Sequence, residues 1–323
     1  MIQSTQKKGS EKTRFSSGLL VQQQPGQTII HRAAKEVPEF ATQLKKFHQQ
    51  MTLSSFSKST LYSYARAVSG LALHFEKTPL DLDDEQINNY LYKLTLNDSM
   101  SKTYFKHLVY GLRFFFRMYD RETRALKLPS IKFDQKLPVV LSRQELKRLF
   151  MAPKRLKQRV IFCLIYAAGL RISELCNLRI SDLDFDRKQI RIRQSKGNKD
   201  RYVIMSEYII KGLKRHMAEA KPSVYVFNGR VNGEPISKGT IGNSFRLALK
   251  KANILKEACV HTLRHSFATH MLEDGVDIVT IKEQLGHAHV RTTMMYLHVA
   301  TIPRSQVRSP LDTLYYEELE ASS

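Results

Sequence analysis

The sequence contains no tryptophan, only three cysteines, and no apolar run of about 18 residues that could span a bilayer. The cysteines form no CxxC pair or other close zinc-type spacing, which argues against disulfides and against a structural zinc. The N-terminal segment is basic but has no apolar signal core followed by a small-residue cleavage site. These absences argue against a membrane role and predict a cytoplasmic protein.

Acidic residues are also scarce relative to basic ones. The chain has 30 Asp and Glu against 52 Lys and Arg, which gives a formal net charge of +22. So large an excess favours a polyanionic partner, because basic side chains that neutralise phosphates release condensed counterions. Nucleic acid is the leading candidate and an anionic surface comes second. The alternative, a basic protein that is merely soluble, accounts less well for the charge.

The length of 323 residues suggests about two domains. Residues 1–36 are rich in Gln, Ser, Lys and Gly without sustained periodicity, and we expect a flexible basic arm there. Residues 37–127 show helical periodicity. The segment 128–138 has a proline near each end and no clear period, as a linker would. A second domain over 139–300 and a tail over 301–323 complete the predicted organisation.

The first domain shows apolar stripes at helical spacing. A helix that begins near Ser101 carries Lys and Arg between its apolar positions, and these could line a DNA face. We interpret the aromatic residues as core rather than as platforms for stacking bases. The stripes contain Leu61, Tyr64, Ala65, Val68, Ala72 and Phe75, then Ile87, Tyr90, Leu91 and Leu94, then Phe105, Val109, Leu112 and Phe116.

The second domain begins with Ser142 and Glu145 in the spacing of a helix capping box. A buried helix is predicted over 159–170. Two strand-like runs at 189–194 and 201–205, separated by the polar segment SKGNKD, predict a β-hairpin. Further helices are expected over 206–219, 237–252, 262–274 and 277–286, with a last short one around Tyr296. The fold class is therefore mainly α (α+β), with a small antiparallel sheet.

Two clusters carry residues suited to chemistry. Arg171 follows a long apolar stretch and needs an anion, which Glu174 three residues later could supply as a simple ion pair. In HTLRHSFATH, helical spacing places His261, Arg264, His265 and Thr269 on neighbouring faces. A zinc-protease helix would need a Glu where this segment has Thr262, and no acidic cluster for magnesium accompanies the histidines. Metal catalysis is therefore disfavoured.

Metal-free attack on a phosphodiester would require guanidinium groups to neutralise the phosphate, a nucleophile aligned with the leaving group, and proton donors. Tyrosine can serve as the nucleophile if a positive environment stabilises its phenolate. The chain contains this whole inventory.

The order and spacing of these residues resemble the catalytic domain of the tyrosine recombinases, the phage-integrase family, and are most similar to bacterial Xer-like enzymes. The matching segments run in one order from 169 to 298. The intervals agree as well, with His261 three residues before Arg264, His287 23 residues after it, and Tyr296 nine residues later. The segments are GLRISEL, SKGNKDR, HTLRHSFATHML, IKEQLGH and TTMMYLH.

The resemblance implies a role for each matched residue. Arg171 and Arg264 would hold the scissile phosphate while Tyr296 attacks it, and Glu174 would support the first arginine. Lys196, just before Gly197, would be the general acid for the departing 5′-oxygen, with Lys199 as its main rival. His261 would assist proton transfer and His287 would donate a hydrogen bond to the phosphate. His289 and His298 match no catalytic position and are expected to be surface or packing residues.

The resemblance also implies a site-specific recombinase that cleaves and rejoins DNA through a 3′-phosphotyrosyl intermediate and a Holliday junction. No metal, ATP or other cofactor is implied. Residues 37–127 would be the helical core DNA-binding domain and 139–300 the catalytic domain. Expected partners are double-stranded DNA recombination sites, with four protomers on two sites and a nucleoid-associated location. A monomer in free solution, an accessory protein and a second recombinase are open alternatives.

Rival functions are a type IB topoisomerase, a DNA-binding protein without cleavage, and a metal nuclease. The biological task is open among integration and excision of a mobile genetic element, cassette exchange, inversion and dimer resolution. The tail contrasts with the rest of the chain because it is acidic after Arg308. We expect it to form a short helix that docks on a neighbouring protomer, with a tail packed in cis or a frayed end as alternatives. Tyr315 and Tyr316 in it lack the preceding LGH segment of Tyr296.

Overall fold

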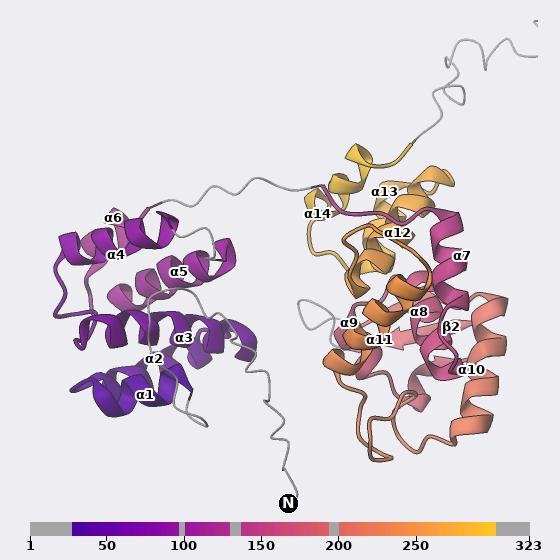
Figure 1. Ribbon diagram of the computed structural model, residues 1–323, viewed down its shortest axis with the longest axis horizontal. Helices are drawn as coiled ribbons and strands as arrows, with labels where there is room; N and C mark the ends of the chain where they lie inside the picture. Colours follow the sequence, from indigo (N-terminus) through magenta and orange to yellow (C-terminus); the bar gives the residue numbers. More distant parts are fainter. Residues whose placement is uncertain (1–27, 97–100, 130–136, 194–199, 302–323) are drawn as a thin grey trace, which may run out of the picture. The chain divides into compact units, whose positions relative to one another are not determined.

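The computed structural model describes residues 28–96, 101–129, 137–193 and 200–301 (Figure 1). The chain divides into two compact units, one within residues 1–134 and one within residues 135–323. Each unit has its own hydrophobic core. In the described residues, no helix is both long enough and apolar enough to cross a bilayer.

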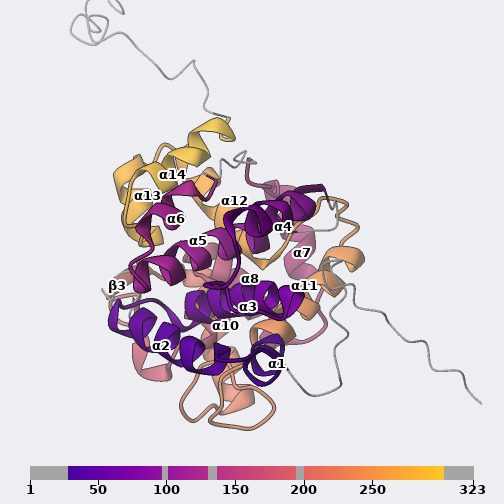
Figure 2. The ribbon, with the colours of Figure 1, turned by 90° about the vertical axis from the view of Figure 1, so that its left-hand side faces the viewer.

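The described part of the first unit is entirely helical (Figure 2). Helix α3 lies at its centre and packs against both α1 and α5. The predicted apolar stripes are buried or half-buried in this core, which confirms their interpretation as packing residues. The elements are α1 (Ile29–Glu36), α2 (Phe40–Leu53), α3 (Lys58–Phe75), α4 (Asp84–Leu96), α5 (Lys102–Met118) and α6 (Glu122–Lys127).

Helix α1 corrects the prediction of a flexible arm over residues 1–36. The Thr28 side chain accepts a hydrogen bond from the backbone N–H of His31 and so caps the helix. Ala33 is fully buried, and Arg32 forms an ion pair with Glu36 one turn later. An eight-residue helix is too short for its periodicity to be seen in the sequence, but packing against α3 stabilises it. The rest of the predicted arm lies outside the described residues.

The second unit combines helices with a three-stranded antiparallel sheet in the order β1-β2-β3. Its elements are α7 (Arg143–Met151), α8 (Leu156–Ala167), α9 (Ile172–Cys176), η1 (Ile180–Asp182), β1 (Leu183–Asp184), β2 (Gln189–Ile192), β3 (Arg201–Ile204), α10 (Glu207–Ala220), α11 (Lys238–Lys251), α12 (Val260–Glu273), α13 (Ile278–Leu285), α14 (Arg291–Met294) and η2 (Met295–His298).

The predicted hairpin is confirmed as β2 and β3, with Ile190 opposite Val203 and both side chains buried. The two-residue strand β1 adds a third strand that was not predicted, because so short a segment carries no alternation. The capping box is confirmed: the Ser142 hydroxyl accepts from the Glu145 N–H at 3.2 Å, and the Glu145 carboxylate accepts from the Ser142 N–H at 2.7 Å.

Helix α8 is the central element of the second unit. It packs against α10 on one side and against α12 on another, and its apolar positions from Val160 to Ile165 are buried, apart from the half-buried Cys163. This confirms the predicted buried helix. Helices α9 and α12 both contribute to the main core of the second unit, and α12 shares a smaller core with α13. This packing brings together the chain segments that carry the predicted catalytic residues. The fold class is mainly α with a small antiparallel sheet, as predicted.

Candidate active site

The site begins where α8 ends and the chain turns into α9. Gly169 lies in this turn with φ +58°, a left-handed conformation that costs glycine little. A Cβ atom here would lie 2.6 Å from the Phe267 ring. The close approach of this turn to α12 therefore requires glycine at position 169. This close approach places Arg171, the residue before α9, beside α12.

Glu174 on α9 binds two arginines at once. Its carboxylate accepts from Arg171 Nη1 at 2.7 Å, which confirms the predicted ion pair, and from the Arg171 backbone N–H at 2.8 Å. Arg201 of β3 adds two parallel hydrogen bonds, at 2.9 and 2.8 Å. Burial alone would raise the pKa of Glu174, but the hydrogen bonds and charge of Arg201, together with the hydrogen bonds from Arg171, outweigh it and hold the pKa at about 2.

Arg264 on α12 is the most buried member of the set, with 1% of its surface exposed. Its two terminal nitrogens donate to the carbonyl oxygens of Gly169 at 2.7 Å and of Leu285 at 2.6 Å. The nearest Glu174 oxygen lies 3.8 Å away. Burial and the neighbouring positive charge of Arg171 lower its pKa to about 9. The guanidinium is still charged at neutral pH, and main-chain oxygens fix its plane.

Two predicted histidines lie beside these arginines. His261 is exposed in the first turn of α12, and desolvation together with the charges of Arg264 and Arg171 lowers its pKa. His287 follows α13, and its Nδ1 lies 2.9 Å from the Thr293 hydroxyl. Burial and then the charge of Arg264 lower the pKa of His287 to about 3. Both imidazoles are therefore neutral at pH 7 before any anion binds.

Tyr296 lies in η2 with 2% of its surface exposed. Its hydroxyl lies 3.1 Å from Nδ1 of His265, a residue to which the sequence assigned no role. Burial raises the pKa of Tyr296, and the charges of Arg264 and Arg171 act in the opposite direction. The charges of both arginines thus act on the nucleophile candidate, whose side chain is almost fully buried.

The structure brings together all the predicted site residues that it describes. Lys196 and its rival Lys199 lie outside the described residues, as do Tyr315 and Tyr316. His289 and His298, predicted to be surface or packing residues, are exposed. Sequence reasoning missed Arg201, and it grouped His265 with His261 and Arg264 without giving it a role. Both stand inside the quoted motifs, SKGNKDR and HTLRHSFATHML, but no periodic signal linked them to Glu174 or Tyr296.

Within the residues that the structure describes, no three His, Cys, Asp or Glu side chains are grouped so that they could hold a metal ion.

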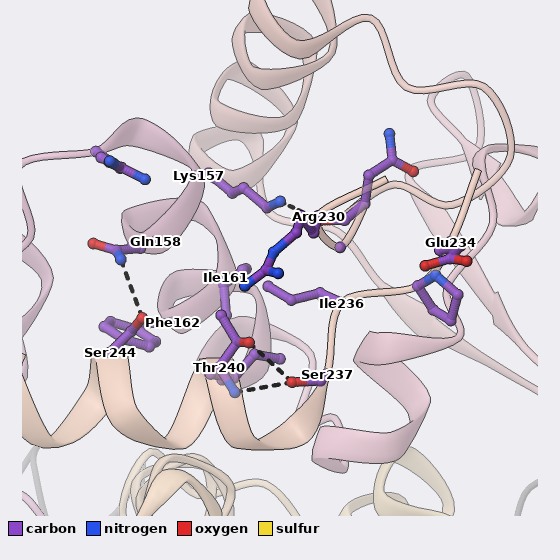
Figure 3. A pocket seen from close by; sticks show the side chains of 15 residues that line it. Lys157, Gln158, Ile161, Phe162, Arg230, Glu234, Ile236, Ser237, Thr240 and Ser244 are labelled. Carbon is purple, nitrogen blue, oxygen red and sulfur yellow. Dashed lines mark hydrogen bonds between the residues drawn. The ribbon is translucent and has the colours of Figure 1, made fainter. Parts of the chain in front are cut away.

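The second unit also has a cavity that lies apart from the predicted catalytic residues. A cavity of about 530 Å³ lies between α8 and the start of α11, with Lys157, Gln158 and Arg230 on its wall (Figure 3). It contains none of the predicted catalytic residues.

Comparison with known proteins gives a match over both units. Residues 139–301 match the phage integrase family, and residues 44–123 match its N-terminal SAM-like domain. The putative integrase/recombinase y4qK of Sinorhizobium fredii is 36% identical over 272 residues, which cover 84% of this chain and 88% of that protein. The chain belongs to the phage integrase family.

Other relatives of this integrase-family protein carry a more specific name. The tyrosine recombinase XerD of Staphylococcus saprophyticus is 32% identical, with 78% of this chain and 90% of that protein covered. A crystal structure of a lambda integrase dimer bound to a COC′ core site shares the fold, with a TM-score of 0.65, 18% identity and coverage of 78% and 96% of the two chains. The chain is therefore a tyrosine recombinase, an enzyme that cleaves and rejoins DNA.

Proposed function

We propose that this recombinase exchanges strands between two specific DNA sites and that Tyr296 is its nucleophile. The observation that supports this most is that Arg171, Arg264, His261 and His287, which come from three chain segments, form one positively charged cluster with the buried Tyr296 of a fourth segment. A protein that only bound DNA would need cations, but it would not need a tyrosine within reach of them.

In the proposed reaction, the Tyr296 oxygen attacks the scissile phosphorus and the bond from phosphorus to the 5′-oxygen breaks. A 3′-phosphotyrosyl ester forms, and the departing 5′-oxygen takes a proton from Lys196. Arg171 and Arg264 neutralise the nonbridging oxygens in the transition state. Attack by the 5′-hydroxyl of another strand reverses the step and rejoins the DNA, so the ester conserves the energy of the broken bond.

The neutral histidines suit complementary tasks in this reaction. A neutral His261 has a lone pair that can take the phenolic proton, and a neutral His287 still has one N–H with which to donate to a phosphate oxygen. An incoming phosphate would also stabilise the protonated form of either ring. Glu174 contributes by fixing the Arg171 side chain rather than by touching the DNA.

The proposed partners are duplex DNA recombination sites. The net charge of +22 supports extensive contact with phosphates. Residues 37–127 would be the core DNA-binding domain and 139–300 the catalytic domain, with four protomers assembling on two sites through a Holliday junction. The protein would act on the nucleoid in the cytoplasm, and the tail 301–323 would dock on a neighbouring protomer.

The test uses a pool of nicked duplexes with a randomised core, so that the cut fragment diffuses away and the covalent adduct is trapped. The wild type should yield an adduct whose DNA, once sequenced, defines the site. Tyr296→Phe should yield none, whereas Tyr315→Phe should react normally. An unchanged adduct yield from Tyr296→Phe would contradict the assignment. Adducts without sequence preference, together with relaxation of supercoiled plasmid, would indicate a topoisomerase instead.

A further inference from the structure

The hydrogen bond between Tyr296 and His265 connects the segment that carries the nucleophile to α12. The two residues are 31 positions apart in the sequence, and their ring centroids lie 5.7 Å apart with tilted planes. The Tyr296 ring packs in a small core with Phe267, Ala268 and Leu285. The ring is thus held by packing, and the His265 nitrogen lies within hydrogen-bonding distance of its hydroxyl.

This contact places the Tyr296 hydroxyl beside His265 and not beside His261, the histidine proposed to take its proton. His265 follows His261 by four residues on α12, which corresponds to about 6 Å along the helix axis. The His261 ring is exposed, and it meets the His265 ring edge to face at 4.5 Å. The hydroxyl therefore contacts the histidine that lies one helical turn along α12 from the exposed His261.

His265 has the right protonation state to accept a hydrogen bond. Burial, and then the neighbouring His261 and Arg264, lower the pKa of His265 to about 4, so the ring is neutral at pH 7. A neutral ring that carries its proton on Nε2 offers a lone pair on Nδ1, to which the Tyr296 hydroxyl donates. Only 2% of the Tyr296 surface is exposed and its hydroxyl is engaged with His265, so a DNA phosphate has little access to it in this arrangement.

We propose that His265 is a positioning residue that holds the Tyr296 hydroxyl in a buried resting position, and that this hydrogen bond breaks before Tyr296 attacks DNA. The proposal rests on the proposed function of Tyr296 as the nucleophile. His265 would keep the nucleophile away from the phosphate site until DNA binding shifts η2. It would take no part in the bond-breaking step.

The proposal predicts the direction of a rate change. An interaction made only in the ground state slows a reaction, because it must be given up on the way to the transition state. A net hydrogen bond of ordinary strength corresponds to roughly a fivefold effect. Removing the acceptor at position 265 should therefore accelerate the first-turnover formation of the adduct by about fivefold.

The experiment compares three variants on the duplex selected from the nicked pool. His265→Phe keeps a ring against His261 but removes the acceptor, and it should form the adduct about fivefold faster than wild type with unchanged DNA affinity. His265→Asn places an oxygen near the former Nδ1 position and should restore the wild-type rate. His270→Phe is the matched control, because His270 on the same helix makes an equivalent 3.0 Å hydrogen bond to the Tyr166 hydroxyl.

A second measurement follows Tyr296 without DNA. N-acetylimidazole acetylates accessible tyrosines, and peptide mass spectrometry should show more acetylation of Tyr296 in folded His265→Phe than in wild type or in His270→Phe. Thermal unfolding of each variant verifies that it is folded. A slower adduct rate in folded His265→Phe, or unchanged acetylation of Tyr296, overturns the proposal. Absence of any Tyr296 adduct in the wild type would instead contradict the proposed function.

Discussion

Glu174 and Arg201 are joined by two parallel hydrogen bonds at 2.9 and 2.8 Å, and both side chains are at least nine-tenths buried. Arg201 also donates to the Gln284 carbonyl at 3.0 Å, so it ties the sheet to α13 as well as to α9. This pair links β3, which follows the SKGNKD segment, to α9, the helix that begins directly after Arg171. The supporting structure of the phosphate site therefore depends on one carboxylate.

Replacing Glu174 with Gln should lower the free energy of unfolding at pH 7 by about 3 to 5 kcal/mol, because arginines would be left buried without their counter-charge. The pKa of Glu174 is lowered from 4.5 to about 2. Its contribution is therefore fully present above about pH 4.5 and is lost as the pH falls through about 2. Urea unfolding across this window should show the stability of the wild type converging on that of the variant.

The control for this substitution is Glu207→Gln, which breaks an ion pair with Lys188 in which both side chains are more than half exposed. An exposed pair contributes about 1 kcal/mol or less. If Glu174→Gln and Glu207→Gln lost the same free energy of unfolding, the central role of Glu174 would be contradicted.

Gly169→Ala should destabilise the catalytic unit and reduce cleavage together. Alanine would be strained at φ +58°, and its Cβ would clash with the Phe267 ring, so we expect a loss of about 3 kcal/mol. The displaced Gly169 carbonyl would no longer fix Arg264. Gly275→Ala separates the two causes, because Gly275 also has positive φ but no atom lies within 4 Å of the added Cβ. Thermal unfolding should show a loss of only about 1 kcal/mol there.

The choice between Lys196 and Lys199 as the general acid can be decided with a modified leaving group. Lys196→Ala should slow cleavage of ordinary DNA by about 10² to 10⁴-fold, since a general acid contributes in this range. A substrate with sulfur in place of the 5′-bridging oxygen needs no proton donor, so it should restore the rate. Lys199→Ala should react normally with both substrates. Single-turnover kinetics that gave the opposite pattern would assign the role to Lys199.

Helix α5 offers a test of the proposed DNA face on the first unit. Arg117 is exposed on α5, and if it contacts a phosphate, Arg117→Gln should reduce the slope of log affinity against log salt by about 1. Lys127→Gln is the control, because Lys127 is also exposed to solvent but is already paired with Asp84 at 2.9 Å. Fluorescence anisotropy titrations at several salt concentrations measure both slopes. Equal slopes for Arg117→Gln and wild type would place Arg117 away from the DNA.

The sequence by itself determined the features that depend on near neighbours. The capping box of Ser142 and Glu145, the pair of Arg171 and Glu174, and the hairpin of β2 and β3 each arise from residues close along the chain. Helical and strand periodicities report which face of an element is buried, so the cores of both units were also predictable. The ordered motifs indicated the enzyme class, because their intervals match a known family.

Only the tertiary structure decided which distant groups meet. Tyr296 contacts His265 across 31 residues, Arg201 reaches Glu174 across 27, and Arg264 binds the carbonyl of Gly169 across 95. Such contacts depend on how α8, α9, α12 and α13 pack, and periodicity along one element carries no information about its partner. The same reason explains α1, a helix too short to be seen in its own sequence, which is stabilised by packing against α3 and by the burial of Ala33 in the core of the first unit.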